Sequence, residues 1–156
     1  MDEKKLLKYA IDYLSKYDSS KKNLTNVLKR KIFRLTINNS EKAIFLKDIE
    51  KIILKLQSNN LISDKRYCSN KISYLSRIGK SKKYICSYLI KKGIDKIEVQ
   101  NNLDIFNNEN NNWELKSARL FAKKKNFINS NESYEKKLSK MARAGFSYEI
   151  CKKILG

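Results

Sequence analysis

The stretch LIKKGIDKIEV, from Leu89 to Val99, decides how we interpret the fold of this chain. It reads as the end of one helix, a glycine, and the start of another helix. Gly93 is free to adopt the positive φ that ends many helices, and Ile94 supplies the apolar contact that often follows such an end. Asp95 is a preferred N-cap residue, and Glu98 three positions later completes a capping-box pattern. The stretch therefore predicts a short helix-turn-helix corner.

A second stretch of the chain repeats this corner. KMARAGFSYEI, from Lys140 to Ile150, has Gly145 at the glycine position, Phe146 as the apolar residue and Ser147 at the capping position. Gly79 is expected to end an earlier helix in a similar way. The repetition predicts that one structural unit occurs more than once along the chain.

Apolar residues recur at helical spacing outside the corners as well. In the first third of the chain this spacing predicts helices over 3–17, 21–35 and 43–58, with the polar segment TINNSEK between the last two. Ser19 or Ser20 is the candidate N-cap of the second helix.

Helix ends further along the chain have similar signals. Asn59-Asn60 is expected to end the third helix in a left-handed conformation. Ser63 and Ser81 are the candidate N-caps of the two helices that precede Gly93. The polar run NNENNN, 107–112, predicts a loop.

Together these signals predict an all-α fold: an elongated tandem array of three three-helix repeats with helix-turn-helix-like corners. The predicted repeats span 1–62, which is divergent, 63–112, which ends in the polar linker 107–112, and 113–156. The absence of proline and the presence of only four glycines favour helix. Each repeat would bury little apolar surface alone, so we expect neighbouring repeats to stack.

The chain is strongly basic, since 35 Lys and Arg residues against 16 Asp and Glu residues give a formal net charge of +19. So large a charge on a small protein favours an anionic partner, above all nucleic acid. A/T-rich codons offer another explanation, because they favour Lys, Asn, Ile and Tyr. That bias accounts for Lys in place of Arg, but such an exchange leaves the charge unchanged. We therefore favour a nucleic-acid-associated role.

The sequence also bounds the location and the redox chemistry. It has no secretory signal pattern and no run of about 18 apolar residues, so we expect a cytoplasmic protein with no membrane partner. Cys68, Cys86 and Cys151 are odd in number and far apart, which predicts neither a disulfide framework nor a zinc site. We expect them to be buried structural thiols.

Residue types that commonly carry catalysis are missing. The chain has no histidine and no phosphate-binding loop of the Gly-x-x-x-x-Gly-Lys type. Carboxylates such as Asp64 and Glu98 stand on predicted amphipathic helices, where solvated or capping roles are usual. We therefore expect no enzyme activity, no cofactor and no metal site.

The candidate functional surface is basic and surrounds the corners, where Lys and Arg side chains would contact phosphates or an acidic partner. The first cluster of candidate residues comprises Arg77, Lys80, Lys82, Lys83, Lys91 and Lys92. The second cluster comprises Lys123, Lys124, Lys140 and Arg143. The residues expected to build the corners are Gly79, Gly93, Asp95, Gly145, Phe146 and Ser147.

Aromatic residues accompany the basic ones. Tyr84, Tyr88 and Tyr134 could stack on nucleic-acid bases, although their helical spacing is more typical of core residues. We expect Trp113 to be a packing anchor between units rather than a platform for bases.

The ordered set of these residues resembles the RecX family of recombinase regulators. The central segment matches at Leu61, Ile62, Asp64, Arg66, Tyr67, Arg77, Gly79, Leu89, Lys92, Gly93 and Ile94. The closing segment matches at Ala118, Lys123, Lys124, Leu138, Gly145, Phe146 and Ile150. The resemblance covers 61–156 well and the preceding residues loosely. Departures include Ser63, Cys68 and Ala144, and Ala144 removes a positive charge that is usual before the second glycine.

This resemblance implies tandem three-helix repeats that bind within the helical groove of the RecA–single-stranded DNA filament. Proteins of this family restrain strand exchange, ATP hydrolysis and repressor cleavage. The implied partners are therefore the RecA filament and the single-stranded DNA inside it. We expect the chain to act as a monomer.

Two other functions stay open. The chain could be a basic helix-turn-helix DNA-binding protein that acts mainly through the phosphate backbone, or an interaction scaffold whose charge is codon bias. Scarce Arg near the corners and few Asn or Gln base readers argue against base readout. Salt-sensitive DNA binding without RecA would favour the first alternative, and binding to neither DNA nor filament would favour the second.

Overall fold

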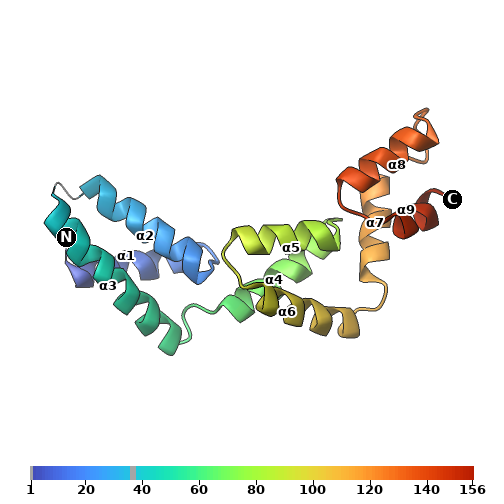
Figure 1. Ribbon diagram of the computed structural model, residues 1–156. Coiled ribbons are helices and arrows are strands. Elements are labelled where there is room, and N and C mark those ends of the chain that lie inside the picture. The colour runs from blue at the N-terminus through green and yellow to red at the C-terminus, as the bar shows by residue number, and fades with distance from the viewer. Residues whose placement is uncertain (1, 36–37) are drawn as a thin grey trace. The chain divides into compact units, whose positions relative to one another are not determined.

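The computed structural model of the chain describes residues 2–35 and 38–156. Over these residues it contains nine helices and no strand (Figure 1), which confirms the predicted all-α fold. In chain order the helices are α1 (Glu3–Lys16), α2 (Lys21–Leu35), α3 (Asn39–Ser58), α4 (Asp64–Arg77), α5 (Lys82–Lys91), α6 (Lys96–Glu109), α7 (Trp113–Lys124), α8 (Tyr134–Arg143) and α9 (Tyr148–Leu155).

The chain folds into two compact units. The first unit comprises Met1–Tyr67 together with Lys92–Ile94, and the second comprises Cys68–Lys91 together with Asp95–Gly156. The corner at Gly93 therefore belongs to the first unit, although the helices on either side of it belong to the second. The boundaries of the three predicted repeats stay a prediction.

Helices α1, α2 and α3 pack against one another in the first unit (Figure 1). Their hydrophobic core consists of Leu6, Ala10, Leu24, Leu28, Ile32, Ile49, Ile52, Leu56 and Ile62. Each helix contributes one apolar face, as helical spacing in the sequence predicts. These three helices therefore have a core of their own.

Helix α3 begins at Asn39, whereas the sequence pattern predicts a start near residue 43. The side chain of Asn38 accepts a hydrogen bond from the backbone N–H of Glu41 over 2.8 Å and so caps the helix. The prediction was wrong because the polar segment TINNSEK contains an N-cap and the first turn of a helix. Residues 36 and 37 of that segment lie outside the described residues.

Helices α4, α5 and α6 also bury the apolar faces that the sequence predicts. Their buried residues include Cys68, Ile72, Leu75, Ile85, Leu89, Val99 and Leu103. Helix α6 continues to Glu109, so most of the polar run predicted as a loop over 107–112 is a helix end or its cap. The reason is that half-buried Phe106 extends the apolar face of α6, where its ring meets Trp113 at a centroid distance of 5.5 Å.

The predicted αL helix ends are confirmed at four places. Asn60, Gly79, Gly93 and Gly145 have φ values of 58°, 92°, 84° and 99°. At Gly79 the N–H of Lys80 donates to the carbonyl of Leu75 over 3.0 Å, the bond expected one residue past such an end. This bond gives the Leu75 carbonyl a hydrogen-bond partner, which the last carbonyl groups of a helix do not find within the helix itself.

The predicted capping box at Asp95 is wrong in its second half. Asp95 caps α6 by accepting from the N–H of Ile97 over 2.8 Å. The Glu98 carboxylate, however, accepts from the side-chain amide of Asn102 over 3.1 Å. Glu98 therefore contacts the next turn of its own helix instead of the cap.

Helices α7, α8 and α9 pack together within the second unit (Figure 1). Their core consists of Ala118, Ala122, Phe127, Met141, Phe146 and Cys151. The ring of Phe121 lies 5.6 Å from that of Phe146, so the apolar residue of the second corner is a core residue.

Candidate interaction surface

Ser20 joins the start of α2 to the corner at Gly93 in the first unit. Its hydroxyl accepts from the N–H of Asn23 over 3.1 Å, which caps α2, and donates to the carbonyl of Lys92 over 2.6 Å. One hydroxyl can do both because it carries a donor and two acceptor lone pairs. The side chain is fully buried. Ser20 is therefore a cap and a tertiary contact at once.

Ser81 makes the same pair of contacts in the second unit. Its hydroxyl accepts from the N–H of Tyr84 over 3.1 Å, capping α5, and donates to the carbonyl of Ala144 over 2.7 Å. Ala144 directly precedes Gly145, as Lys92 directly precedes Gly93. We call each such contact between a capping serine and a glycine corner a joint. The two joints have the same hydrogen bonds, which supports an internal repeat.

A carboxylate completes each joint. In the first unit the N–H of Lys21 donates to Asp64 over 2.9 Å. In the second unit the N–H of Lys82 donates to Glu114 over 2.9 Å. A negative charge is favourable there because the open N–H groups at a helix start carry partial positive charge. Asp64 was expected to be solvated or to cap a helix, and it caps the start of α2.

The glycines of the two corners allow this close approach. A Cβ atom at Gly93 would lie 2.5 Å from the Cβ of Lys22. A Cβ atom at Gly145 would lie 2.4 Å from the Oγ of Ser81 and 3.2 Å from the Cβ of Lys83. Real Cβ atoms do not come so near, so glycine is required at both corners for packing as well as for its positive φ.

The joint at Ser81 brings the two predicted basic clusters together. Lys82 and Lys83 directly follow Ser81, and Arg143 directly precedes Ala144, the acceptor of its hydroxyl. All three basic side chains are exposed. The sequence predicts two separate clusters because a contact across 63 positions leaves no local signal.

Helix α7 also reaches this region. The ammonium group of Lys124 donates to the carbonyl of Ile78 over 2.9 Å, and the hydroxyl of Ser117 donates to the carbonyl of Lys80 over 2.6 Å. We name the basic surface at this joint the corner cluster and define it as Arg77, Lys82, Lys83, Lys124 and Arg143. All of its members are exposed.

The other predicted site residues do not belong to the corner cluster, either because they lie elsewhere or because their charged group already contacts another side chain. Lys91 is the last residue of α5, about 14 Å along the helix from Lys82. Lys92 follows directly and belongs to the first unit. Lys123 is exposed at the end of α7. Lys80 is half-buried, and its ammonium group lies 4.5 Å from the ring centroid of Tyr84.

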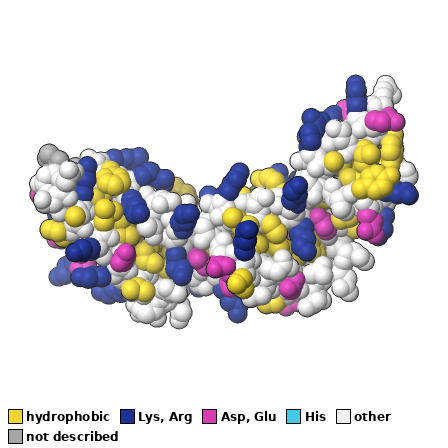
Figure 2. Space-filling model, viewed as in Figure 1, with side chains coloured by type: hydrophobic (Ala, Val, Ile, Leu, Met, Phe, Trp, Pro, Cys, Tyr) yellow, Lys and Arg dark blue, Asp and Glu magenta, His cyan; other side chains and the backbone are white. Residues whose placement is uncertain are grey.

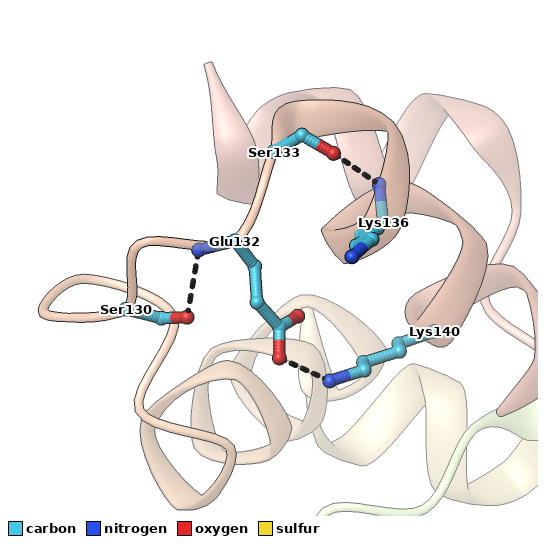
Figure 3. Close-up of polar contacts among 5 residues, drawn as sticks. All are labelled: Ser130, Glu132, Ser133, Lys136 and Lys140. Atoms are coloured by element: carbon cyan, nitrogen blue, oxygen red, sulfur yellow. Dashed lines mark hydrogen bonds and ion pairs between the residues drawn. The ribbon is translucent and has the colours of Figure 1, made fainter.

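Lys140 is paired with a carboxylate (Figure 3). Its ammonium group forms an ion pair and hydrogen bond with Glu132, whose backbone N–H is bound by Ser130 over 3.1 Å. The hydrogen bond from Lys140 lowers the pKa of Glu132 below its usual range, and the charges of Lys136 and Lys137 act in the same direction. Lys140 therefore fixes the segment before α8.

Sequence reasoning missed a basic helix. Helix α2 carries six basic side chains and no acidic one: Lys21, Lys22, Lys29, Arg30, Lys31 and Arg34. Figure 2 shows Lys and Arg side chains along the surface over this helix. The signal was available, because a stretch of 15 residues without any carboxylate is visible in the sequence itself.

The aromatic expectations had mixed outcomes. Tyr84 and Tyr134 are 41% and 40% exposed. The prediction from helical spacing that they are core residues was therefore wrong. Trp113 is 7% exposed and packs on Phe106, as a packing anchor should. Half-buried Tyr88 lies beside Tyr84 at a ring centroid distance of 6.5 Å.

The three thiols do not form disulfides. Cys68 and Cys151 are buried as predicted, while Cys86 is only half-buried. Burial raises the pKa of the Cys86 and Cys151 thiols, which keeps them in the neutral form. Within 2–35 and 38–156, His, Cys, Asp and Glu side chains form no group suited to a metal ion. In the same part of the chain, no helix has the length and apolar character needed to cross a membrane.

Fold and surface together define an all-α protein with serine-capped joints and a basic surface. No protein-family model matches the chain. A protein named regulatory protein RecX, from Myxococcus xanthus (strain DK1622), is 30% identical to it over 154 residues, and the match covers 94% of this chain and 81% of that protein. The chain therefore belongs to the RecX family of regulatory proteins, as its resemblance to that family implies.

Solved structures agree with this assignment. The crystal structure of RecX from Lactobacillus salivarius matches with a TM-score of 0.72 at 26% identity, over 98% of this chain and 94% of that one. A second crystal structure, of a regulatory protein RecX, has the same fold with a TM-score of 0.72 at 20% identity, over 97% of this chain and 70% of that one.

Proposed function

We propose that this protein is a non-enzymatic regulator of RecA that binds the RecA–single-stranded DNA filament. Bound there, it restrains ATP hydrolysis, strand exchange and repressor cleavage. The observation that carries this proposal is the relationship to regulatory protein RecX, which extends over 94% of the chain.

The charge distribution supports a filament as the target. The formal net charge is +19, and the corner cluster and helix α2 present their cations on the surface. Each Lys or Arg that approaches a phosphate releases a bound counterion, so such contacts add salt-sensitive affinity. We assign the corner cluster, together with Lys80, Lys91, Lys92, Lys123 and Lys140, to contacts with phosphates or with acidic side chains of RecA.

The two glycine corners have a packing role in the fold. The corner at Gly93 is packed against Lys22, and the corner at Gly145 is packed against Ser81. The first turns of the helices that follow are exposed at Ile97 and Tyr148, so bare single-stranded DNA is tested beside the filament below. These corners hold helices together, which leaves exposed basic faces as the contact surface.

Binding to preformed filaments tests the proposal. Fluorescently labelled protein is titrated with RecA assembled on poly(dT) with a slowly hydrolysed ATP analogue, and in parallel with poly(dT) alone. We expect at least about tenfold tighter binding to the filament than to the bare strand. Equal affinity for both would contradict filament recognition and favour the general DNA-binding alternative.

Charge reversal in the corner cluster sharpens this test. Lys82→Glu combined with Arg143→Glu should weaken filament binding, because both side chains are exposed at one joint. Lys51→Glu combined with Lys55→Glu, at two exposed positions on α3, is the matched control. The variants should have the same helix content by circular dichroism, so that lost binding reports lost contacts.

A further inference from the structure

The second unit contains a groove whose lining shares a single residue, Lys123, with the surface assigned to the proposed function. It lies among α7, α8, α9 and the segment that joins α7 to α8, and its volume is about 610 Å³. This volume falls within the range of roughly 300–1,000 Å³ that is typical of ligand sites. Figure 2 shows that hydrophobic side chains reach the surface over α8 and α9.

The floor and walls of the groove are apolar. Phe127, Ile154 and Leu155 line it together with Ile128 and Tyr134. Ile128 is 90% exposed and Tyr134 is 40% exposed, while Phe127 is buried. An isoleucine left almost wholly in water costs free energy that a covering partner would recover.

The rim of the groove is cationic. Arg119, Lys123, Lys137 and Lys153 line it, and no carboxylate does. Lys153 forms an exposed ion pair with Glu149 over 3.7 Å on the same helix, and the charge of Lys137 helps to lower the pKa of the Glu132 carboxyl. In the described part of the chain, the rim cations other than Lys153 have no ion pair.

The segment between α7 and α8 forms one wall and is fixed in place. The ion pair of Glu132 with Lys140 ties it to α8 (Figure 3). The ring of Phe127 packs on Phe121 at a centroid distance of 6.1 Å. A wall that is held by these contacts presents Ile128 in a set position. Binding there therefore costs little further ordering.

We propose that this groove docks an acidic amphipathic helix of a partner protein. The helix would place apolar side chains spaced at i, i+3 and i+7 in the groove and carboxylates against the cationic rim. Single-stranded nucleic acid fits less well, because bases stack on aromatic rings. Tyr134 is the exposed aromatic ring of the lining, Phe127 is buried, and Ile128, Ile154 and Leu155 are aliphatic. A second copy of the chain fits less well too, because two cationic rims would repel each other.

A designed peptide tests the apolar part of this proposal. The probe is a fluorescent helical peptide of about 15 residues, with Leu at one face and Glu elsewhere. Ile128→Asp should weaken its binding by about tenfold, since an exposed anchor is lost. Ile97→Asp, at a position on α6 that is 71% exposed and outside the groove, should leave the affinity unchanged.

Charge variants test the rim. Arg119→Glu with Lys137→Glu should weaken binding of the acidic peptide and flatten its salt dependence. Lys152→Glu combined with Lys116→Glu, at two exposed positions outside the groove lining, is the control with the same change of charge. A scrambled peptide of the same composition, with Leu spread around the helix, should bind more weakly.

Three results would overturn the inference. The first is equal peptide binding by the Ile128→Asp variant and the unaltered protein. The second is an oligo(dT) strand whose affinity falls with Ile128→Asp more than that of the peptide. The third is self-association in sedimentation equilibrium that Ile128→Asp abolishes. The assay contains no RecA, so its failure is distinct from a failure of the proposed function.

Discussion

The hydroxyl of Ser81 donates to the carbonyl of Ala144 over 2.7 Å. It also accepts the N–H of Tyr84 over 3.1 Å, so one fully buried side chain caps α5 and holds the corner between α8 and α9. Two hydrogen-bonding roles depend on it, and its position brings Lys82 and Lys83 next to Arg143.

Ser81→Ala should lower the free energy of unfolding by about 2 kcal/mol, because it removes a cap and leaves a carbonyl without its partner. Urea unfolding followed by circular dichroism measures the change. Ser87→Ala, at an exposed position on the same helix, should stay within about 0.5 kcal/mol of the unaltered protein. A loss no larger than that of Ser87→Ala would mean that the joint does not stabilise the fold.

Ser20→Ala should have an effect similar to that of Ser81→Ala, since Ser20 bonds Asn23 and Lys92 in the same manner. Hydrogen exchange can localise the two changes, because each substitution should reduce protection around its own joint. Protection lost in the same amides for both variants would argue against two separate joints of one design.

Gly145→Ala should destabilise the protein by about 1–3 kcal/mol through its φ of 99°. The new methyl group would also meet the Oγ of Ser81 at 2.4 Å. Adding Ser81→Ala removes that oxygen, so the double variant should lose less stability than the sum of the single ones. Strict additivity in urea unfolding would contradict this contact. Gly156→Ala is the control for a steric clash, because an added Cβ there meets nothing within 4 Å.

The ion pair between Glu132 and Lys140 predicts a pH dependence. The pKa of Glu132 is lowered in the folded protein, chiefly by the hydrogen bond from Lys140. Its contribution to stability is therefore complete above the unfolded-state pKa of a glutamate and is lost as the pH falls through the lower, folded-state pKa.

Glu132→Gln tests this dependence. The variant should be less stable than the unaltered protein at neutral pH, and the difference should shrink as urea unfolding is repeated at increasingly acid pH. Glu135→Gln, on the first turn of α8, is the matched control. A difference that stays constant with pH would show that the carboxylate charge is not what stabilises the segment.

Salt titration should separate the contributions of the basic surfaces. Affinity for a single strand falls as salt rises, and each phosphate contact makes the slope of log affinity against log salt steeper by about 0.7. Lys29→Glu with Arg30→Glu on α2, and Lys82→Glu with Lys83→Glu at the corner cluster, should each reduce that slope for filament binding. An unchanged slope for both pairs would exclude these surfaces from phosphate contact.

Local features of this fold could be predicted from the sequence because their causes are local. The caps by Ser63, Ser81 and Ser147 and the glycine ends are set by residues within one turn of one another. The errors arose where polar sequence continues a helix, as at the ends of α3 and α6. Asn caps a helix well, so a run of Asn does not by itself mean a loop.

The arrangement of the candidate site could not be predicted, because it depends on contacts between distant residues. Lys124 meets Ile78, 46 positions away in the sequence, and Ser81 meets Ala144, 63 positions away. The groove at Ile128 was missed for a related reason. A single isoleucine in a polar segment carries no periodic signal.

ATP hydrolysis by RecA on single-stranded DNA tests the central claim most directly. RecA from the same organism is assayed with this protein added well below one copy per protomer. The account predicts strong inhibition that a modest excess of competing DNA does not relieve, with weaker inhibition by Lys82→Glu combined with Arg143→Glu. No inhibition, or inhibition that added DNA abolishes, would contradict filament regulation.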